Sequence, residues 1–139
     1  MIVLDSNVIS AFMRRTPDPK VLAWLDGQAP ESIWTTSVCV FEIRFGIQIL
    51  VPGKRRAYLD QAFTYVLNNI LAGRVLNFDT AAATAAAELA AEMRAHGLVI
   101  ETRDLQIAAV CKARHAVLAT HNTKHFLHTG IALMDPWAN

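Results

Sequence analysis

Three carboxylate side chains stand at points where a folded chain could use them for chemistry. Asp5 directly follows the apolar run Ile2-Val3-Leu4, Glu42 lies in a stretch of helical periodicity, and Asp104 begins another. Each alone is weak evidence, because an acid after a strand can be a turn residue and an acid in the first turn of a helix is stabilised by the helix dipole. Their chemistry depends on whether the fold brings them together.

Carboxylates that converge on one crevice repel one another. Two unit charges about 4 Å apart interact by roughly 4 kcal/mol at an effective dielectric constant near 20, so such a cluster must bind a cation or take up a proton. Oxygen ligands favour Mg²⁺ or Mn²⁺, which prefer carboxylates and water to imidazole or thiolate. We therefore expect one of these ions at Asp5, Glu42 and Asp104.

Two further polar residues follow a predicted strand late in the chain. Asn122 can add a neutral oxygen or a hydrogen bond, and Thr120 can add a hydroxyl that positions a metal-bound water. Sites of this kind activate water for attack on a phosphodiester and stabilise the charge that develops on the phosphoryl oxygens. The residue set predicts a metal-dependent phosphodiesterase.

Glu42 is the most informative of the acids, because Gly46 lies one helical turn further along the same face. A glycine inside a helix costs about 1 kcal/mol relative to alanine, so the room that it leaves beside the carboxylate can have a use. The alternative, of equal weight, is that Glu42 is one polar position of an amphipathic helix that also carries Arg44 and Gln48.

The elements that must position these residues alternate between strand and helix. Gly27 marks the end of one helix, and Ser37 is the predicted N-cap of another. The alternation predicts an α/β fold of three layers, with a central parallel sheet of four to five strands and helices on both faces. The predicted strands are 2–4, 33–36, 75–78, 116–119 and 131–134, and the predicted helices lie near 8–13, 21–25, 38–49, 54–71, 80–95 and 103–114.

Charge and length limit the kinds of partner. The 139 residues, which we expect to form one domain over 1–139, carry 13 Lys and Arg against 12 Asp and Glu, so a polycation and an acidic disordered tail are both excluded. Any nucleic-acid contact must come from a local patch. Two candidates are Arg14-Arg15 with Lys20, and Lys54-Arg55-Arg56, for which solvated helix ends are the alternative.

The cysteines and the apolar segments indicate the compartment. Cys39 and Cys111 lie among apolar neighbours, and we expect both to be reduced core residues. The first residues lack the basic start of a signal peptide, and no apolar stretch reaches 18 uninterrupted residues. A cytoplasmic protein without a membrane span is therefore expected.

Four segments, in this order and spacing, resemble the PIN-domain ribonucleases, in particular the VapC and FitB type toxins of bacterial toxin-antitoxin pairs. The resemblance covers essentially the whole chain and includes the closing Asp135-Pro136-Trp137. The segments are Ile2-Val3-Leu4-Asp5-Ser6-Asn7-Val8-Ile9-Ser10, Thr36-Ser37-Val38-Cys39-Val40-Phe41-Glu42-Ile43-Arg44-Phe45-Gly46-Ile47, Asp104-Leu105-Gln106-Ile107-Ala108-Ala109 and Leu118-Ala119-Thr120-His121-Asn122-Thr123-Lys124-His125-Phe126.

The resemblance implies a PIN fold, with Mg²⁺ or Mn²⁺ at Asp5 and Asp104 supported by Glu42. It implies an endoribonuclease that cleaves RNA without a covalent enzyme intermediate, as the toxin of a type II toxin-antitoxin pair. It also implies a homodimer held inactive by a cognate antitoxin, whose C-terminal segment enters the acidic groove with an arginine. Operator DNA would be contacted only through that antitoxin.

The chain departs from the family pattern at three positions. Asn122 stands where Asp is frequent, which puts a second metal ion in doubt. Arg103 precedes the acid where a small residue is usual, and His121 precedes Asn122 where Arg is usual. Both can alter contacts at the rim of the site.

Three other functions compete with this interpretation. His121, His125 and His128 could form a zinc site, although no matched carboxylate or cysteine lies near them in sequence. Asp5 could carry a phosphoryl group, although no suitable acid or lysine accompanies it. The third is a non-catalytic PIN module that acts mainly in a DNA-binding complex with its antitoxin.

Overall fold

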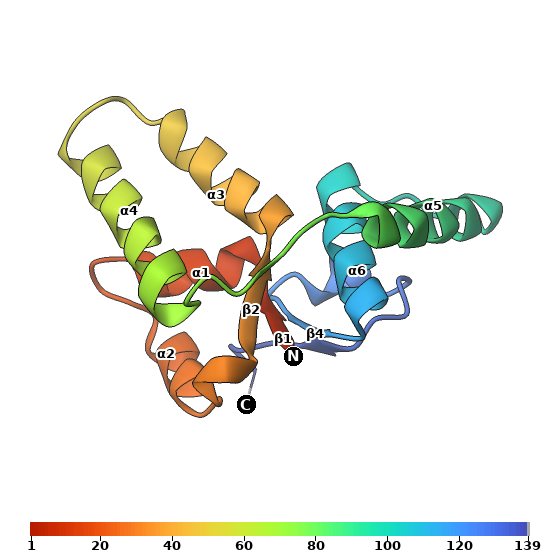
Figure 1. Ribbon diagram of the computed structural model, residues 1–139, viewed down its shortest axis with the longest axis horizontal. Helices are drawn as coiled ribbons and strands as arrows, with labels where there is room; N and C mark the ends of the chain where they lie inside the picture. Colours follow the sequence, from red (N-terminus) through yellow and green to blue (C-terminus); the bar gives the residue numbers. More distant parts are fainter. Residues whose placement is uncertain (139) are drawn as a thin grey trace.

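The computed structural model describes residues 1–138, in which strands and helices alternate along the chain (Figure 1). The strands are β1 (Ile2–Leu4), β2 (Ile33–Thr36), β3 (Val75–Leu76), β4 (Val117–Ala119) and β5 (Leu133–Met134). The α-helices are α1 (Ser6–Met13), α2 (Pro19–Asp26), α3 (Ser37–Gln48), α4 (Lys54–Tyr65), α5 (Thr80–Ala95) and α6 (Thr102–Arg114). Short 3-10 turns cover Pro30–Ser32 and Thr123–Phe126, and a π-helical turn covers Val66–Ile70.

The strands form one parallel sheet with the order β3-β2-β1-β4-β5. The chain moves outward from β1 through β2 to β3 and then returns to the other side of β1 with β4. This reversal brings the carboxyl ends of β1 and β4 together, at the place where α/β sheets open a crevice. The predicted fold, a parallel sheet with helices on both faces, is confirmed.

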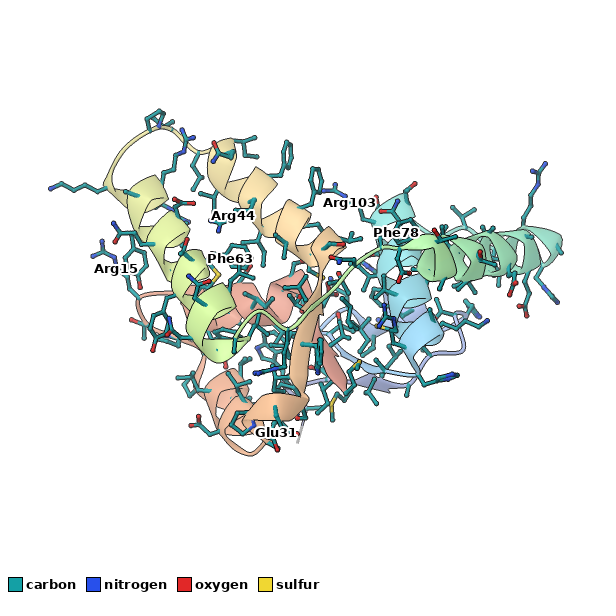
Figure 2. All side chains as sticks on the ribbon, in the orientation of Figure 1. Arg15, Glu31, Arg44, Phe63, Phe78 and Arg103 are labelled. Atoms are coloured by element: carbon teal, nitrogen blue, oxygen red, sulfur yellow. The ribbon has the colours of Figure 1, made fainter. Side chains whose placement is uncertain are left out.

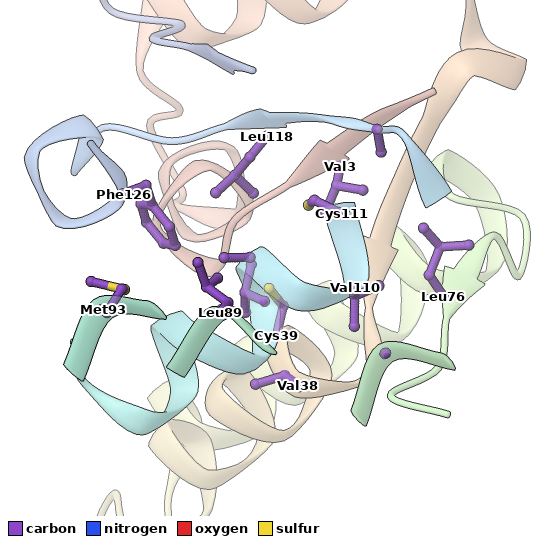
Figure 3. Close-up of a cluster of buried hydrophobic side chains, with 14 residues drawn as sticks. Val3, Val38, Cys39, Leu76, Leu89, Met93, Val110, Cys111, Leu118 and Phe126 are labelled. Carbon is purple, nitrogen blue, oxygen red and sulfur yellow. The ribbon is translucent and has the colours of Figure 1, made fainter. Parts of the chain in front are cut away.

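Side chains of the central strands alternate between two cores, one on each face of the sheet. Val3 and Leu118 pack with residues of α5 and α6, including Leu89, as Figure 3 shows. Their neighbours Leu4 and Ala119 face the opposite core, which α1, α2 and α4 cover. This period of two, with apolar residues on both faces, is what a parallel sheet requires, because helices cover both of its sides.

The N-cap of helix α3 lies one residue earlier than predicted. The hydroxyl of Thr36 accepts a hydrogen bond from the Cys39 backbone N–H at 3.0 Å, so Thr36 is the N-cap and the prediction of Ser37 is wrong. Ser37 lies in the first turn, where its hydroxyl accepts a hydrogen bond from the Phe78 N–H at 3.0 Å. The serine therefore ties α3 to the segment after β3.

Three predicted elements are shorter in the structure by two residues or more. The predicted helix 54–71 ends as an α-helix at Tyr65 and continues as the π-helical turn. The predicted strands 75–78 and 131–134 pair only over Val75–Leu76 and Leu133–Met134, because these edge strands have a neighbour on one side only. Asp79 caps α5 by accepting from the Ala82 N–H at 2.9 Å.

The helices form two pairs that diverge from the sheet (Figure 1). Helices α3 and α4 pack together on one side, and α5 packs along α6 on the other. No helix in residues 1–138 combines the length and the apolar character needed to cross a lipid bilayer.

Candidate active site

Asp5 stands at the point where the order of the strands reverses. It follows β1 and caps α1, where its Oδ1 accepts a hydrogen bond from the Ser6 N–H at 2.8 Å. Because β1 pairs with β4, Thr120 at the end of β4 lies beside it and donates its hydroxyl to Asp5 Oδ2 at 2.8 Å. The carboxylate is only 4% exposed.

A network of polar groups around the buried Thr120 hydroxyl fixes this carboxylate. The Thr120 hydroxyl also accepts hydrogen bonds from Asn7 Nδ2 at 3.2 Å and from the Asn122 N–H at 3.0 Å. Asn7 donates to Asp5 Oδ2 at 3.3 Å, and its Oδ1 accepts from the His121 N–H at 3.1 Å. One donated and two accepted bonds saturate the Thr120 hydroxyl, so it holds Asp5 directly.

Glu42 reaches the same place from α3. Its Oε1 accepts a hydrogen bond from the Ser6 hydroxyl at 3.3 Å. Gly46, one turn further along α3, has open space where a side chain would begin, and it lines the same groove as Glu42. The open space beside the Glu42 carboxylate, which was predicted from Gly46, is therefore present.

Asp104 enters from the first turn of α6. Glu101 caps this helix by accepting from the N–H groups of Arg103 and Asp104 at 2.9 and 3.2 Å. On its other side, Asp104 Oδ2 lies 3.3 Å from Nδ1 of His125, a residue that the sequence analysis considered only as a zinc ligand. The imidazole therefore contacts an acid of the cluster.

The three acids line one open groove of about 860 Å³. Asn122 and His125 also line it, whereas Thr120 is fully buried beneath Asp5. The other lining residues are Ser6, Asn7, Ser10, Met13, Arg14, Ile43, Gly46, Ile47, Leu50, Arg55, Leu59, Glu101 and Arg103.

Burial acts on all three carboxyls, and the charge of Asp5 acts on the other two. Burial raises the pKa of Asp5, and the hydrogen bonds from Thr120 and Ser6 only partly oppose it. Burial, followed by the charge of Asp5, raises the pKa of Glu42 and also that of Asp104. The acids thus feel one another, and a cation among them would relieve the repulsion.

The cations already present do little to neutralise the cluster. Arg103 Nε lies 3.9 Å from Glu42 Oε2 and 3.8 Å from Glu101 Oε1, and its guanidinium covers the Phe41 ring at 5.7 Å (Figure 2). Its side chain is 40% exposed, and such loose, solvated pairs contribute little. Arg103 therefore lies at the rim and leaves the acids available.

The donor set of the site fits a hard cation. Single ligand atoms of Asp5, Cys39 and Glu42 lie within 4.8 Å of one another. Burial, followed by the charge of Asp5, raises the pKa of the Cys39 thiol, so the sulfur stays protonated. Its Sγ lies 3.9 Å from Asp5 Oδ1 as a weak donor. With the thiol excluded, the remaining ligands are carboxylate oxygens, which suit Mg²⁺ or Mn²⁺.

The histidines do not form a zinc site. His121 packs against the Trp137 ring at 4.4 Å and lies 3.5 Å from Asp135, whereas His125 contacts Asp104. Within the described residues, the group of Asp5, Cys39 and Glu42 is the one trio of ligand atoms close enough to share an ion.

A comparison with protein families identifies the fold. The model of the PIN domain matches residues 2–131. The chain belongs to the PIN-domain family. Among its PIN-domain relatives, the plasmid stability protein StbB of Pseudomonas syringae pv. tomato is 42% identical over 99% of both chains. The VapC ribonuclease Y4jK of Sinorhizobium fredii is 39% identical, covering 99% of this chain and 98% of its own.

A solved structure agrees with this PIN assignment. The complex described as FitAB bound to IR36 DNA fragment contains a chain that superposes with a TM-score of 0.90 at 34% identity. The match covers 100% of this chain and 97% of the other. The resemblance to the VapC and FitB type is thus confirmed.

Sequence reasoning missed part of this PIN-domain site. Asp5, Glu42, Asp104 and Asn122 line the groove as a group, and Thr120 lies behind Asp5. The residues not anticipated are Ser6, Asn7, Glu101 and His125. The first two could have been found from their place directly after the first strand, but the contact of His125 with Asp104 depends on the tertiary fold.

Proposed function

We propose that this PIN domain is a metal-dependent endoribonuclease, the toxin of a type II toxin-antitoxin pair, which cleaves RNA phosphodiesters with activated water. The observation that carries the proposal is the meeting of Asp5, Glu42 and Asp104 in one groove. Burial raises the pKa of all three carboxyls, and the charge of Asp5 further raises those of Glu42 and Asp104. The relationship to a VapC ribonuclease supports the choice of RNA.

Asp5, Asp104 and Glu42 would hold Mg²⁺ or Mn²⁺. Such an ion, when bound, lowers the pKa of water and offsets the charge that develops on the phosphoryl oxygens. The chain itself orients the carboxylate of Asp5 through Thr120 and Asn7, and that of Glu42 through Ser6. Asn122 presents a neutral amide to the groove, where its relatives often carry an acid.

Cleavage would proceed without a covalent intermediate on cysteine. Cys39 and Cys111 are buried free thiols, and burial raises the pKa of each, that of Cys111 to about 12. Neither can supply a thiolate nucleophile, which requires a lowered pKa and an exposed position. Water is then the nucleophile that the acidic groove can serve.

The partner would be a cognate antitoxin that inserts a cationic segment, with an arginine, into the acidic groove. The acids Asp5, Glu42 and Asp104 line the groove, and Arg103 is only loosely paired with Glu42, so their carboxylates can offer bidentate partners to such a residue. Operator DNA would be contacted through the antitoxin alone, and the relationship to the DNA-bound FitAB complex supports this.

A homodimer would use the exposed side of α3. Phe41, Phe45 and Ile49 are exposed at intervals of four residues, and the two phenyl rings stack at 5.8 Å. An apolar stripe of this kind on a helix that also carries Glu42 supports an interface next to the site.

The decisive experiment is RNA cleavage by the Asp5→Asn variant in the presence of Mg²⁺. We expect cleavage to fall at least a hundredfold and the chain to lose its toxicity in cells. The control is Asp26→Asn, which removes the same charge at an exposed position at the end of α2. Cleavage and toxicity that both survive Asp5→Asn would contradict the nuclease and favour the non-catalytic module.

A further inference from the structure

Two basic pairs that lie 39 or more positions apart in sequence meet at one place on the surface. Arg14 and Arg15 follow the end of α1, and Lys54 and Arg55 form the first turn of α4. Together with Tyr58 and Leu59 they line a hollow of about 480 Å³, which we call the basic hollow. Figure 2 shows Arg15 beside α4, on the side away from α5 and α6.

The basic hollow is continuous with the acidic groove. Arg14, Arg55 and Leu59 line both, so the hollow opens toward the groove that holds the three acids. On its other side, Arg14, Arg15 and Tyr58 also line a third hollow, which extends to Tyr65. The Tyr65 side chain is 60% exposed. The acidic groove, the basic hollow and the Tyr65 ring thus lie one after another along the surface.

The cations of the basic hollow lack the partners that other arginines have. Across residues 1–138, no carboxylate lies within 4.0 Å of Arg14, Arg15, Lys54 or Arg55. Arg15 instead lies over the Tyr58 ring, 4.9 Å from its centre. By contrast, Arg44 pairs with Asp60, Arg56 with Gln48, Arg74 with the carbonyls of Ile33, Pro30 and Ile70, and Arg114 with Asp79.

Although the charge of Arg14 helps to lower the pKa of Asp18, no carboxylate in the described part of the chain forms a salt bridge with these cations, and like charges gathered in this way favour a polyanionic ligand. Among polyanions, a single-stranded nucleic acid matches the rest of the surface, because it can place phosphates on the arginines and stack a base on the exposed tyrosine. An acidic peptide could pair its carboxylates with the arginines, but those carboxylates would not stack on the Tyr65 ring. The hollow also leads to the acids proposed to cleave a phosphodiester.

We propose that the basic hollow binds the backbone phosphates of the RNA strand that enters the acidic groove, and that Tyr65 stacks on one of its bases. This rests on the proposed function, whose substrate path it assigns. Of the two basic clusters predicted from sequence, it includes Arg14, Arg15, Lys54 and Arg55. It leaves out Lys20, which does not line the hollow, and Arg56, which is bonded to Gln48.

The test is the affinity for an unstructured, labelled RNA of about 12 nucleotides, measured by fluorescence anisotropy in EDTA over a range of salt concentrations. We expect the double variant Arg15→Gln and Arg55→Gln to bind at least tenfold more weakly. The slope of log affinity against log salt should become shallower by about 1.4, or 0.7 for each lost phosphate contact. All substituted side chains are exposed, so the fold is expected to persist.

The matched control is Arg94→Gln with Lys112→Gln, which removes the same charge at the far ends of α5 and α6. We expect its RNA affinity to stay within twofold of the parent. Tyr65→Ala should weaken binding about fivefold without changing the salt slope, because stacking releases no counterions. An unchanged affinity in Tyr65→Ala would remove the stacking contact from the path.

Two results would overturn the proposal. One is a double variant that binds the RNA as tightly as the parent. The other is a parent chain that binds poly-glutamate more tightly than the RNA and loses that binding in the double variant, which would make the hollow a surface for an acidic protein segment. The binding assay contains no divalent ion and is therefore independent of cleavage. A chain that binds RNA through these arginines but does not cleave it when Mg²⁺ is added contradicts only the proposed nuclease activity. If the double variant cleaves RNA as fast as the parent, only the proposed path of the RNA strand is contradicted.

Discussion

The carboxylate of Asp5 is held in place by hydroxyl and amide groups instead of a basic side chain. Thr120 and Asn7 surround it, and no lysine or arginine within residues 1–138 lies within 4.0 Å of it. A neutral network orients the oxygens without neutralising them. The negative charge therefore stays available to a bound cation.

We predict that Thr120→Val lowers RNA cleavage ten- to hundredfold. Valine keeps the volume but removes the donor to Asp5 and the acceptor for Asn7 and the Asn122 N–H. Positioning groups of this kind affect activity by that factor. Stability should also fall by about 1–3 kcal/mol, because buried polar groups lose their partner. Cleavage rates and urea unfolding measure the two effects.

Thr120→Ser separates the hydroxyl from the methyl group of the side chain. Serine can restore all three hydrogen bonds, so cleavage should return to near the parent rate. Equal losses in the serine and valine variants would show that packing, and not the hydroxyl, is what the site needs.

At the scale of elements, the start of α3 determines where Glu42 lies. The buried Thr36 ends β2 and caps α3 in one step, which leaves no loop between the strand and the helix. We predict that Thr36→Ala destabilises the protein by about 1 kcal/mol, as the loss of an N-cap does. Thermal unfolding checks this, with the exposed Thr84→Ala in α5 as a control that should have a much smaller effect.

The cap of α5 gives a pH dependence. The Ala82 backbone N–H and then the Arg114 guanidinium lower the pKa of Asp79 in the folded chain. A folded-state pKa below the unfolded value means that the unfolded chain binds more protons. This stabilisation is therefore fully present above the ordinary aspartate pKa of 3.8 and is lost as the pH falls through the folded pKa.

We therefore predict that Asp79→Ala is less stable than the parent at pH 6 and that the difference disappears in strong acid. Urea unfolding from pH 6 downward measures it. A difference that stays constant down to pH 2 would mean that packing, and not the charge, accounts for the loss.

The sequence predicted most of the elements because it contains both regular hydrophobic patterns and residues that mark the ends of helices and strands. Short apolar runs identified β1 and β4, and Gly27 marked the end of α2 correctly. The two edge strands, β3 and β5, were predicted too long, because backbone pairing with a neighbouring strand, and not residue propensity, sets their length. The acids were predicted from their places after strands and at a helix start, whereas the contact of His125 with Asp104 needed three dimensions.

At the scale of the whole molecule, the groove draws on β1, α3 and α6 and is therefore formed only in the native state. We predict that Mg²⁺ raises the melting temperature, since a ligand at one hundred times its dissociation constant stabilises by about 2.7 kcal/mol. Glu42→Gln should show a smaller shift and Asp5→Asn none. Calorimetry with and without EDTA measures this, and an unchanged Mg²⁺ response in Glu42→Gln would remove Glu42 from the site.

The central position of β1 in the sheet determines when the acidic groove can form during translation. The neighbouring strand β4 and the Asp5 partner Thr120 are translated more than a hundred residues after Asp5. A nascent chain cannot assemble the acidic groove until Thr120 has left the exit tunnel. The order of strands thus delays formation of the groove until β4 can join the sheet.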